Sequence, residues 1–143
     1  MSAYFDSAYI AKCYVNEPDS VKVRALLGTS GGACSSSLAR AEVAATLLRH
    51  VREGALTAKQ VSALRSDFLK DIADGVWTML PVSDDFMARV AERFDRLPQT
   101  THIRAGDAIH LAAADEAGLR EVWTNDRHML GAASAFGLRG RSV

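Results

Sequence analysis

Residues 4–15 have the sequence Tyr4-Phe5-Asp6-Ser7-Ala8-Tyr9-Ile10-Ala11-Lys12-Cys13-Tyr14-Val15, an apolar pair followed by an aspartate and a segment of helical period. The aromatic pair predicts a short buried strand. The apolar residues from Ala8 to Val15 predict a helix that ends before Pro18. Asp6 therefore stands at the point where a strand turns into a helix.

The same alternation continues along the chain. Further strands are predicted at 33–35, 76–82 and 122–124, with a short extended piece from 137. Helices are predicted between these strands, within 19–28, 38–52, 57–75, 83–94 and 106–117 and from 126 onward. Strands that alternate with helices favour an α/β fold with a central, mostly parallel sheet flanked by helices on both faces. We expect a single domain over 1–143, because no linker, repeat or low-complexity stretch interrupts the pattern.

Composition excludes several classes of protein. The chain has 143 residues, of which 48% are hydrophobic and 24% charged, the balance of a globular protein rather than a disordered one. Seventeen basic and seventeen acidic residues give zero net charge, which argues against a polybasic nucleic-acid or membrane binder. The sequence has neither the ~18–20-residue apolar run that would span a bilayer nor a signal peptide. We therefore expect a cytoplasmic protein without membrane contact.

Four acidic residues are placed differently from the others, which fall on polar helix positions. Asp6 and Asp126 each follow a predicted strand, and Asp107 begins an apolar helix. Glu42 lies among Leu38, Ala41, Ala45 and Leu48, where helical spacing predicts an apolar residue. Taken singly, Asp6 and Asp126 could be helix caps, Asp107 could complement a helix N-terminus, and Glu42 could be half-buried.

Together, the four acids favour a functional site. Strand-to-helix junctions of an open parallel sheet lie along its carboxyl edge, where ligands bind. Carboxylates gathered there repel one another unless a cation neutralises them, and Mg²⁺ favours a few carboxylates plus waters. Such a site suits metal-assisted phosphodiester hydrolysis.

Four motifs resemble those of PIN-domain proteins of the VapC toxin type. They are residues 4–18, the run Ser36-Ser37-Leu38-Ala39-Arg40-Ala41-Glu42-Val43, the run Asp107-Ala108-Ile109-His110-Leu111-Ala112, and Thr124-Asn125-Asp126-Arg127. Their order and spacing cover essentially the whole chain. The resemblance implies a Mg²⁺- or Mn²⁺-dependent endoribonuclease that is the toxin of a toxin–antitoxin pair. The acidic positions of the family are both catalytic and metal-binding, and by this resemblance they map onto Asp6, Glu42, Asp107 and Asp126.

The resemblance also implies a cognate antitoxin and a homodimer. We expect the antitoxin's C-terminal segment to lie across the acidic cleft, with a groove on the early helices for a partner helix. The candidate groove residues are Ile10, Leu26, Leu27, Leu47 and Val51, for each of which core packing is the alternative.

Supporting residues follow from the same motifs. The family usually carries a hydroxyl two residues after the first aspartate, where this chain has Ala8, so Ser7 or Thr124 could hydrogen-bond the carboxylates instead. Asn125 is a further candidate, and His110, about one helical turn after Asp107, could orient that carboxylate or simply pack in the helix. The other histidines lack zinc-ligand spacing. Candidate RNA contacts are Lys12, Arg40, Arg104 and Arg127.

Two other functions stay open on the sequence alone. A catalytically silent PIN-like module would use the acids only as helix caps and would act by binding a partner. A DNA-directed nuclease or a phosphatase would use the same site, because the sequence contains no identifiable reader of the RNA 2′-hydroxyl. The RNA class (tRNA, rRNA or mRNA) is equally undetermined.

Overall fold

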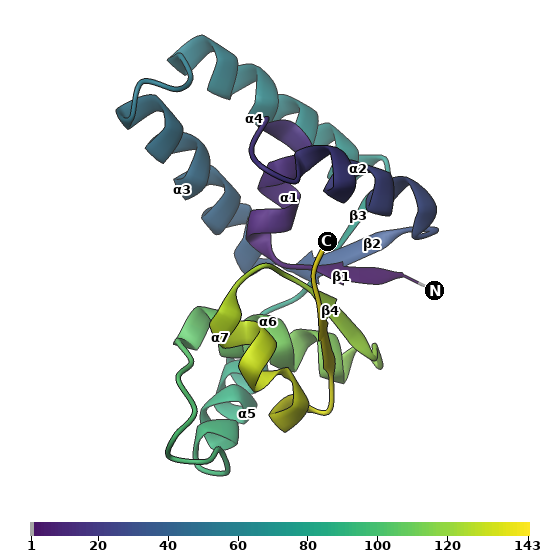
Figure 1. Ribbon diagram of the computed structural model, residues 1–143, viewed down its shortest axis with the longest axis vertical. Helices are drawn as coiled ribbons and strands as arrows, with labels where there is room; N and C mark the ends of the chain where they lie inside the picture. Colours follow the sequence, from purple (N-terminus) through teal and green to yellow (C-terminus); the bar gives the residue numbers. More distant parts are fainter. Residues whose placement is uncertain (1) are drawn as a thin grey trace.

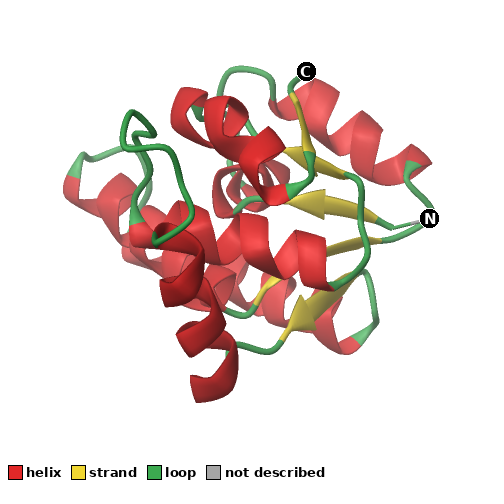
Figure 2. Cartoon of the chain, turned by 90° about the horizontal axis from the view of Figure 1, so that it is seen from below, coloured by secondary structure: helices red, strands yellow, loops and turns green. Residues whose placement is uncertain are grey.

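The computed structural model describes residues 2–143. Within this range, five strands form one sheet in the order β3-β2-β1-β4-β5, and every neighbouring pair is parallel. The strands are β1 (Ala3–Phe5), β2 (Ala33–Ser36), β3 (Trp77–Leu80), β4 (Glu121–Trp123) and β5 (Arg139–Arg141). Figure 2 shows their arrows pointing the same way. The predicted α/β class with a mostly parallel sheet is confirmed.

Helices cover both faces of the sheet (Figure 1). One face carries α1 (Ser7–Tyr14), α2 (Ser20–Thr29), α3 (Leu38–Arg52) and α4 (Ala58–Ala73). The other carries α5 (Asp84–Phe94), α6 (Ala105–Glu116) and α7 (Arg127–Ala132), which continues into a 3₁₀ turn, η1 (Ala133–Phe136). None of the helices within 2–143 is long and apolar enough to cross a bilayer.

Each face of the sheet has its own core. On the first face, Phe5, Tyr9 and Trp77 pack edge to face with ring centroids 5.6–5.7 Å apart. On the second face, the small residues of α6 allow that helix to lie close against β2 and β4, with Leu111 and Val122 fully buried. α6 is buried almost all round, which explains its continuous apolar sequence.

Local signals set several helix starts. Thr57 and Gln60 form a capping box at α4, and the Ser83 hydroxyl accepts from the Phe86 amide at the start of α5. Asp19 precedes α2 as predicted, but its backbone is left-handed, with φ of 70°, and its side chain makes no capping hydrogen bond to the described residues.

The predicted apolar stripe of α3 is wrong by one position. The residues of α3 that are buried against the sheet are Ala39, Val43 and Leu47, whereas Leu48 of the predicted stripe is 59% exposed. Two neighbouring stripes of this helix are both rich in apolar residues, and packing selects one. Glu42 consequently lies on the flank of the buried stripe rather than within it.

The connections that follow the adjacent strands β1 and β4 lead to opposite faces of the sheet. The chain leaves β1 for α1 on one face, and it leaves the adjacent strand β4 for α7 on the other face. In open parallel sheets, the crevice between two such connections at the carboxyl edge is the usual ligand site. Asp6 follows β1 at this point, and Asp126 follows β4.

Candidate active site

Asp6 is a buried carboxylate at the junction of β1 and α1. It is the N-cap of α1, with Oδ1 accepting from the Tyr9 amide at 2.8 Å and Oδ2 accepting from the Thr124 hydroxyl at 2.5 Å. Only 5% of the residue is exposed. Burial raises the pKa of Asp6, the negative charge of Asp126 adds to this effect, and the two hydrogen bonds oppose it. Ionised Asp6 is therefore costly without a nearby cation.

Asp126 is tied to the same position through Thr124. The Thr124 hydroxyl oxygen accepts from the Asp126 amide at 2.9 Å while its proton goes to Asp6. Asp126 caps α7, with Oδ1 accepting from the amides of His128 and Met129. Both aspartates are thus helix caps, as the alternative reading of the sequence allowed. Each cap orients its carboxylate at the carboxyl edge of the sheet, so capping does not compete with a functional role.

Asp107 occupies the first turn of α6. Its Oδ2 accepts from the Arg104 amide at 3.3 Å, which fixes the carboxylate at the helix N-terminus. Partial burial raises the pKa of Asp107, the charges of Asp126 and Glu42 raise it further, and the Arg104 amide opposes the shift. The two negative charges that raise the pKa of Asp107 belong to α3 and to the β4–α7 junction, and both elements approach the start of α6.

Glu42 approaches the site from α3. Its Oε1 accepts from the Ser7 hydroxyl at 2.8 Å and lies 2.6 Å from His110 Nε2. Burial alone would raise the pKa of Glu42, but the hydrogen bond and charge of His110 and the Ser7 hydroxyl outweigh it and lower the pKa. The other oxygen, Oε2, is directed toward Gly106 at the start of α6, where an added Cβ would lie 3.6 Å from it.

The hydrogen bonds of His110 go to residues other than Asp107. One helical turn separates Asp107 from His110, but the ring nitrogens bond to Glu42, Ser7 and Tyr4. The ring lies on the buried side of α6, facing β1, whereas Asp107 lies in the first turn beside Arg104. Contacts between distant segments, rather than spacing along α6, decide which carboxylate this imidazole orients.

A residue of the site's hydrogen-bond network that the sequence reasoning missed is Tyr4. Its hydroxyl lies 2.7 Å from His110 Nδ1 and accepts from the Ser36 amide at 2.9 Å. A signal for it existed, because a tyrosine in a fully buried strand requires a partner for its hydroxyl, unlike phenylalanine.

None of the four acids pairs with a lysine or arginine among the described residues. Asp6, Asp107 and Asp126 form no ion pair there, and the only ion-pair partner of Glu42 is His110. No three His, Cys, Asp or Glu side chains within 2–143 lie close enough to hold a metal ion as a ready-made cage. Mg²⁺ commonly binds through one or two carboxylates and keeps several waters, so an all-oxygen, uncompensated set of this kind fits Mg²⁺.

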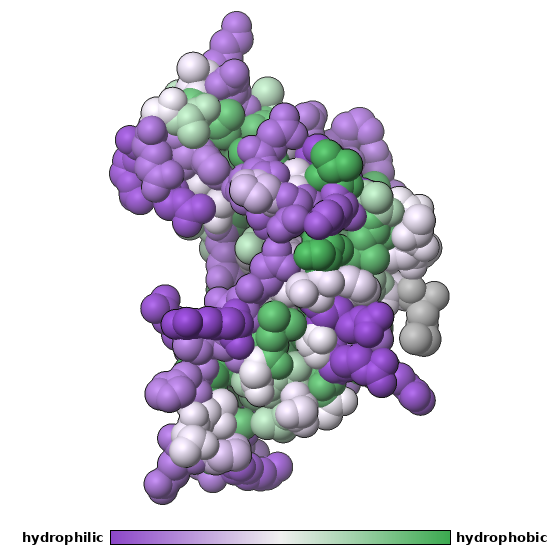
Figure 3. All heavy atoms as spheres, in the orientation of Figure 1, coloured by the Kyte–Doolittle hydropathy of each residue, from purple (hydrophilic) through white to green (hydrophobic). Residues whose placement is uncertain are grey.

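A shallow hollow of about 360 Å³ runs beside Glu42 between α1 and α3. Small side chains form much of its lining, including Ala8, Ala11 and Ala45, with Arg49 at its border. The outline in Figure 3 is indented on the left, between the helices of the two faces, and its surface there is mainly hydrophilic.

The predicted RNA contacts divide into two kinds. Arg40, Arg104 and Arg127 are exposed, so they are free to meet an anionic ligand. Lys12 is not: its side chain is only 12% exposed, pairs with Glu17 at 3.3 Å and donates to the Pro18 carbonyl at 2.8 Å. These contacts give Lys12 a structural role in the α1–α2 turn and leave it little surface for the predicted RNA contact.

Asn125 is exposed, and its Oδ1 accepts from the buried Tyr9 hydroxyl at 2.8 Å. This bond anchors the β4–α7 loop to α1. Asn125 thereby holds the loop that carries Asp126.

The predicted groove for a partner helix needs correction. Ile10 and Leu47 are completely buried in the core under α1 and α3 and offer no surface. Leu26, Leu27 and Val51 are half-buried. The large apolar side chains exposed on the early helices are instead Val21 and Leu48.

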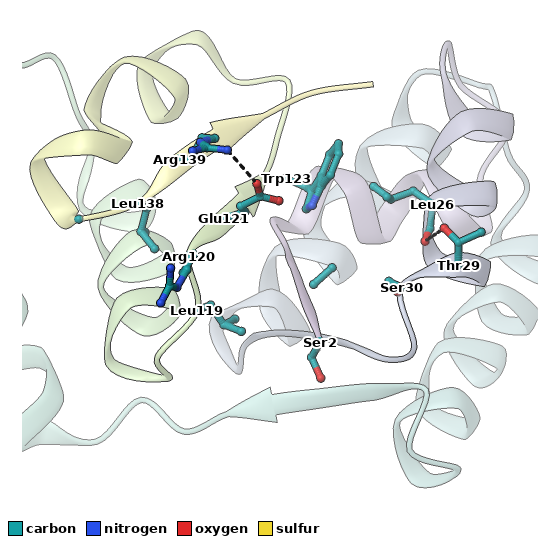
Figure 4. A pocket seen from close by; sticks show the side chains of 12 residues that line it. Ser2, Leu26, Thr29, Ser30, Leu119, Arg120, Glu121, Trp123, Leu138 and Arg139 are labelled. Carbon is teal, nitrogen blue, oxygen red and sulfur yellow. Dashed lines mark hydrogen bonds and ion pairs between the residues drawn. The ribbon is translucent and has the colours of Figure 1, made fainter.

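A larger hollow, about 1060 Å³, lies at the opposite edge of the sheet (Figure 4). It is formed by the starts of β1, β4 and β5 together with the end of α2, and Trp123 and Leu26 face each other across it. Asp6, Glu42, Asp107 and Asp126 take no part in its lining. The volume of a hollow therefore does not identify the acidic site in this protein.

Residues 3–134 match the model of the PIN domain family. The sequence is 34% identical to Ribonuclease VapC46 of Mycobacterium tuberculosis, over 94% of this chain and 92% of that protein. The fold is similar to the crystal structure of VapC20 of M. tuberculosis, a sarcin–ricin loop cleaving toxin, with a TM-score of 0.72, 16% identity, and coverage of 92% of this chain and 95% of that one. It is also similar to VapBC2 from Rickettsia felis bound to a DNA fragment from their promoter, with a TM-score of 0.68, 14% identity, and coverage of 99% and 98%.

Proposed function

Because the chain belongs to the PIN-domain family and is a ribonuclease toxin of the VapC type, we propose that its four acids form a Mg²⁺-dependent site that hydrolyses RNA phosphodiester bonds. The assigned residues are Asp6, Glu42, Asp107 and Asp126. We include 1–143 in one nuclease domain, and Mn²⁺ is an alternative ion.

One observation carries this proposal. A carboxylate that is 95% buried, Asp6, shares the carboxyl edge of the sheet with three further acids, and no lysine or arginine of the described residues pairs with any of them. Helix capping alone explains the orientation of Asp6 and Asp126, but it does not explain why their charges are gathered with those of Asp107 and Glu42. A divalent cation supplies the missing compensation.

The side chains of the site have different proposed roles. Asp6, Asp107, Asp126 and Glu42 would hold the ion, which when bound activates a water and offsets charge on the phosphate. Thr124 keeps Asp6 and Asp126 in a fixed relation through its hydroxyl. Glu42, whose pKa is lowered, stays ionised and can accept a hydrogen bond from a water at Oε2. Arg104 and Arg127, exposed beside the acids, would contact RNA phosphates without reading sequence.

The hydroxyl that the family usually carries two residues after the first aspartate is replaced here by Ala8. Two other hydroxyls contact the carboxylates: Ser7 donates to Glu42, and Thr124 donates to Asp6. We assign the supporting role to these two residues. Ala8 lines the hollow beside Glu42, where its small side chain leaves room for substrate.

The proposed partner is a small antitoxin protein whose segment covers the acidic site, and the proposed setting is the cytoplasm, with no membrane contact. Exposed Val21 and Leu48, together with half-buried Leu26, Leu27 and Val51, offer apolar surface on the early helices for such a partner. We further propose a homodimer, which size-exclusion chromatography with light scattering would test.

The test is cleavage of RNA by the purified protein, with the ends of the products sequenced. Cleavage with Mg²⁺, its loss in EDTA and its return when Mg²⁺ is restored are expected, and Asp6→Asn should be inactive. Cleavage that persists in EDTA would overturn the proposed metal dependence. Equal cleavage of a matched single-stranded DNA would overturn RNA as the specific substrate.

A further inference from the structure

A buried chain of hydrogen bonds runs from the sheet to Glu42. The Ser36 amide donates to the Tyr4 hydroxyl oxygen at 2.9 Å, Tyr4 Oη lies 2.7 Å from His110 Nδ1, and His110 Nε2 lies 2.6 Å from Glu42 Oε1. Tyr4 is fully buried and His110 is 3% exposed, whereas the side chain of Glu42, the last member of this hydrogen-bond series, is 39% exposed. The series of hydrogen bonds thus connects the centre of the fold to the surface of the site.

The direction of each bond follows from the donors available. The Ser36 amide occupies the Tyr4 oxygen as an acceptor, so the single Tyr4 proton is free to go to His110 Nδ1. When Nδ1 accepts, Nε2 carries the ring proton, and a charged ring carries a proton on Nε2 as well, so in both cases Nε2 donates to Glu42 Oε1.

This arrangement treats the two oxygens of Glu42 differently. Oε1 receives hydrogen bonds from both Ser7 and His110, which lie 3.2 Å apart. Oε2 is directed toward the start of α6, the helix that carries Asp107. The carboxylate of a glutamate on an exposed helix flank would otherwise turn among several rotamers. Two donors on one oxygen fix its plane.

We infer that Tyr4 and His110 are positioning residues that hold the Glu42 carboxylate with Oε2 directed into the site. This inference rests on the proposed function, since it gives Glu42 a task at the metal site. It goes beyond that function because it assigns roles to a strand tyrosine and a helix histidine that themselves contact neither the ion nor RNA. In other metal sites, loss of such an outer partner costs about 10–100-fold in metal affinity or activity.

A matched control separates positioning from folding. Tyr14, like Tyr4, has a hydroxyl that accepts one N–H, from Trp77, and donates to one side chain, Asp71, but it lies away from the four acids. Tyr4→Phe and Tyr14→Phe each leave one N–H without its partner, so both should lower the melting temperature. We expect Tyr4→Phe to raise the Mg²⁺ concentration for half-maximal cleavage about ten-fold, with Tyr14→Phe unchanged. Equal Mg²⁺ requirements in the two variants would overturn the inference.

A second pair of variants covers the case in which Tyr4→Phe does not fold. His110→Gln keeps an N–H donor that can reach Glu42, whereas His110→Leu suits the apolar surroundings but removes the donor. A structural role predicts that the leucine variant matches or exceeds the glutamine variant in every property. The positioning role predicts that glutamine retains much more of the Mn²⁺ affinity, measured by calorimetry without RNA, even where leucine gives the higher melting temperature. Equal Mn²⁺ affinities in the two variants would contradict the positioning role.

Glu42→Gln completes the test. In this background Tyr4→Phe should no longer change Mn²⁺ affinity, because the carboxylate that it positions is gone. An undiminished effect of Tyr4→Phe there would overturn the inference. Wild-type protein that neither binds Mn²⁺ nor cleaves RNA would instead refute the proposed function itself, so the two failures are distinguishable.

Discussion

The hydroxyl of Thr124 joins Asp6 to the β4–α7 junction: it donates to Asp6 Oδ2 at 2.5 Å and accepts from the amide that follows Asn125 at 2.9 Å. Thr124 is fully buried, so neither bond can be replaced by bulk water. A single side chain therefore sets the relation between carboxylates that belong to different strands and to helices on opposite faces of the sheet.

Replacing this hydroxyl should damage stability and activity together. Thr124→Val keeps the shape but leaves two buried polar groups unpaired, and we expect a loss of about 1–3 kcal/mol in the free energy of unfolding. RNA cleavage should fall strongly, because Asp6 is no longer fixed relative to Asp126. Thr124→Ser retains the hydroxyl and serves as the control. Denaturant unfolding and cleavage rates measure the two effects, and a fully active Thr124→Val would exclude the coupling.

Asp6→Asn and Asp107→Asn should abolish cleavage without lowering metal-free stability. The asparagine side chain of Asp6→Asn can still accept from the Tyr9 amide and can donate to Thr124, whose proton then turns to Met129 Sδ, 3.9 Å away. Burial and like charges raise the pKa values of both aspartates, so removing either charge relieves a cost. We expect a melting temperature in EDTA that is unchanged or slightly higher. A marked decrease in both variants would favour a purely structural role.

The stability difference between Asp6→Asn and wild type should depend on pH. Since the pKa of folded Asp6 is raised above its usual 3.8, ionisation of Asp6 costs stability at neutral pH. This cost disappears as pH falls through the raised pKa, where wild type carries a neutral acid like asparagine. The pKa of Glu42 is lowered, so its ionisation changes the free energy of unfolding in the opposite direction. This contribution is the same in Asp6→Asn and wild type, and it cancels from the stability difference between them. Melting in EDTA from pH 7.5 down to 4 should show the advantage of Asp6→Asn shrinking; an advantage independent of pH would contradict this account.

RNA affinity should distinguish the exposed arginines from Lys12. Arg104→Ala and Arg127→Ala should each weaken binding and reduce the slope of log affinity against log salt by about 0.7, the value for one phosphate contact to a single strand. Lys12→Ala should leave that slope unchanged and lower stability, because Lys12 holds the turn before α2. Binding is best measured with the inactive Asp6→Asn background at several salt concentrations. A reduced slope for Lys12→Ala would restore its sequence-based assignment.

Much of the fold could be predicted from the sequence because its signals are local. The range of α3 was predicted as observed, and the helix ranges predicted from 57 and 83 begin at residues, Thr57 and Ser83, that cap α4 and α5. The positions of Asp6 and Asp126 followed from one rule, that the carboxyl ends of parallel strands meet at one edge.

The remaining features depend on contacts between distant segments. Which stripe of α3 is buried could not be read from spacing, because Leu48 and Leu47 are equally apolar and only packing exposes one. The partner of His110 is Glu42, 68 residues away, and helical spacing carries no information about such a contact. Lys12 lies next to an acidic motif in the sequence, but its side chain pairs with Glu17 in the turn before α2. Closeness to the motif along the chain does not predict this ion pair.

The central claim is that these carboxylates form a divalent-ion site, and the most direct measurement is thermal unfolding without RNA, with and without Mg²⁺. Wild type should be stabilised by about 1–3 kcal/mol at saturating Mg²⁺, because the ion binds only the folded site. Asp6→Asn, which we expect to fold and to melt in EDTA at a temperature equal to or slightly above that of wild type, should gain little or nothing. An equal gain in both proteins, or no gain in wild type at millimolar Mg²⁺, would contradict the account.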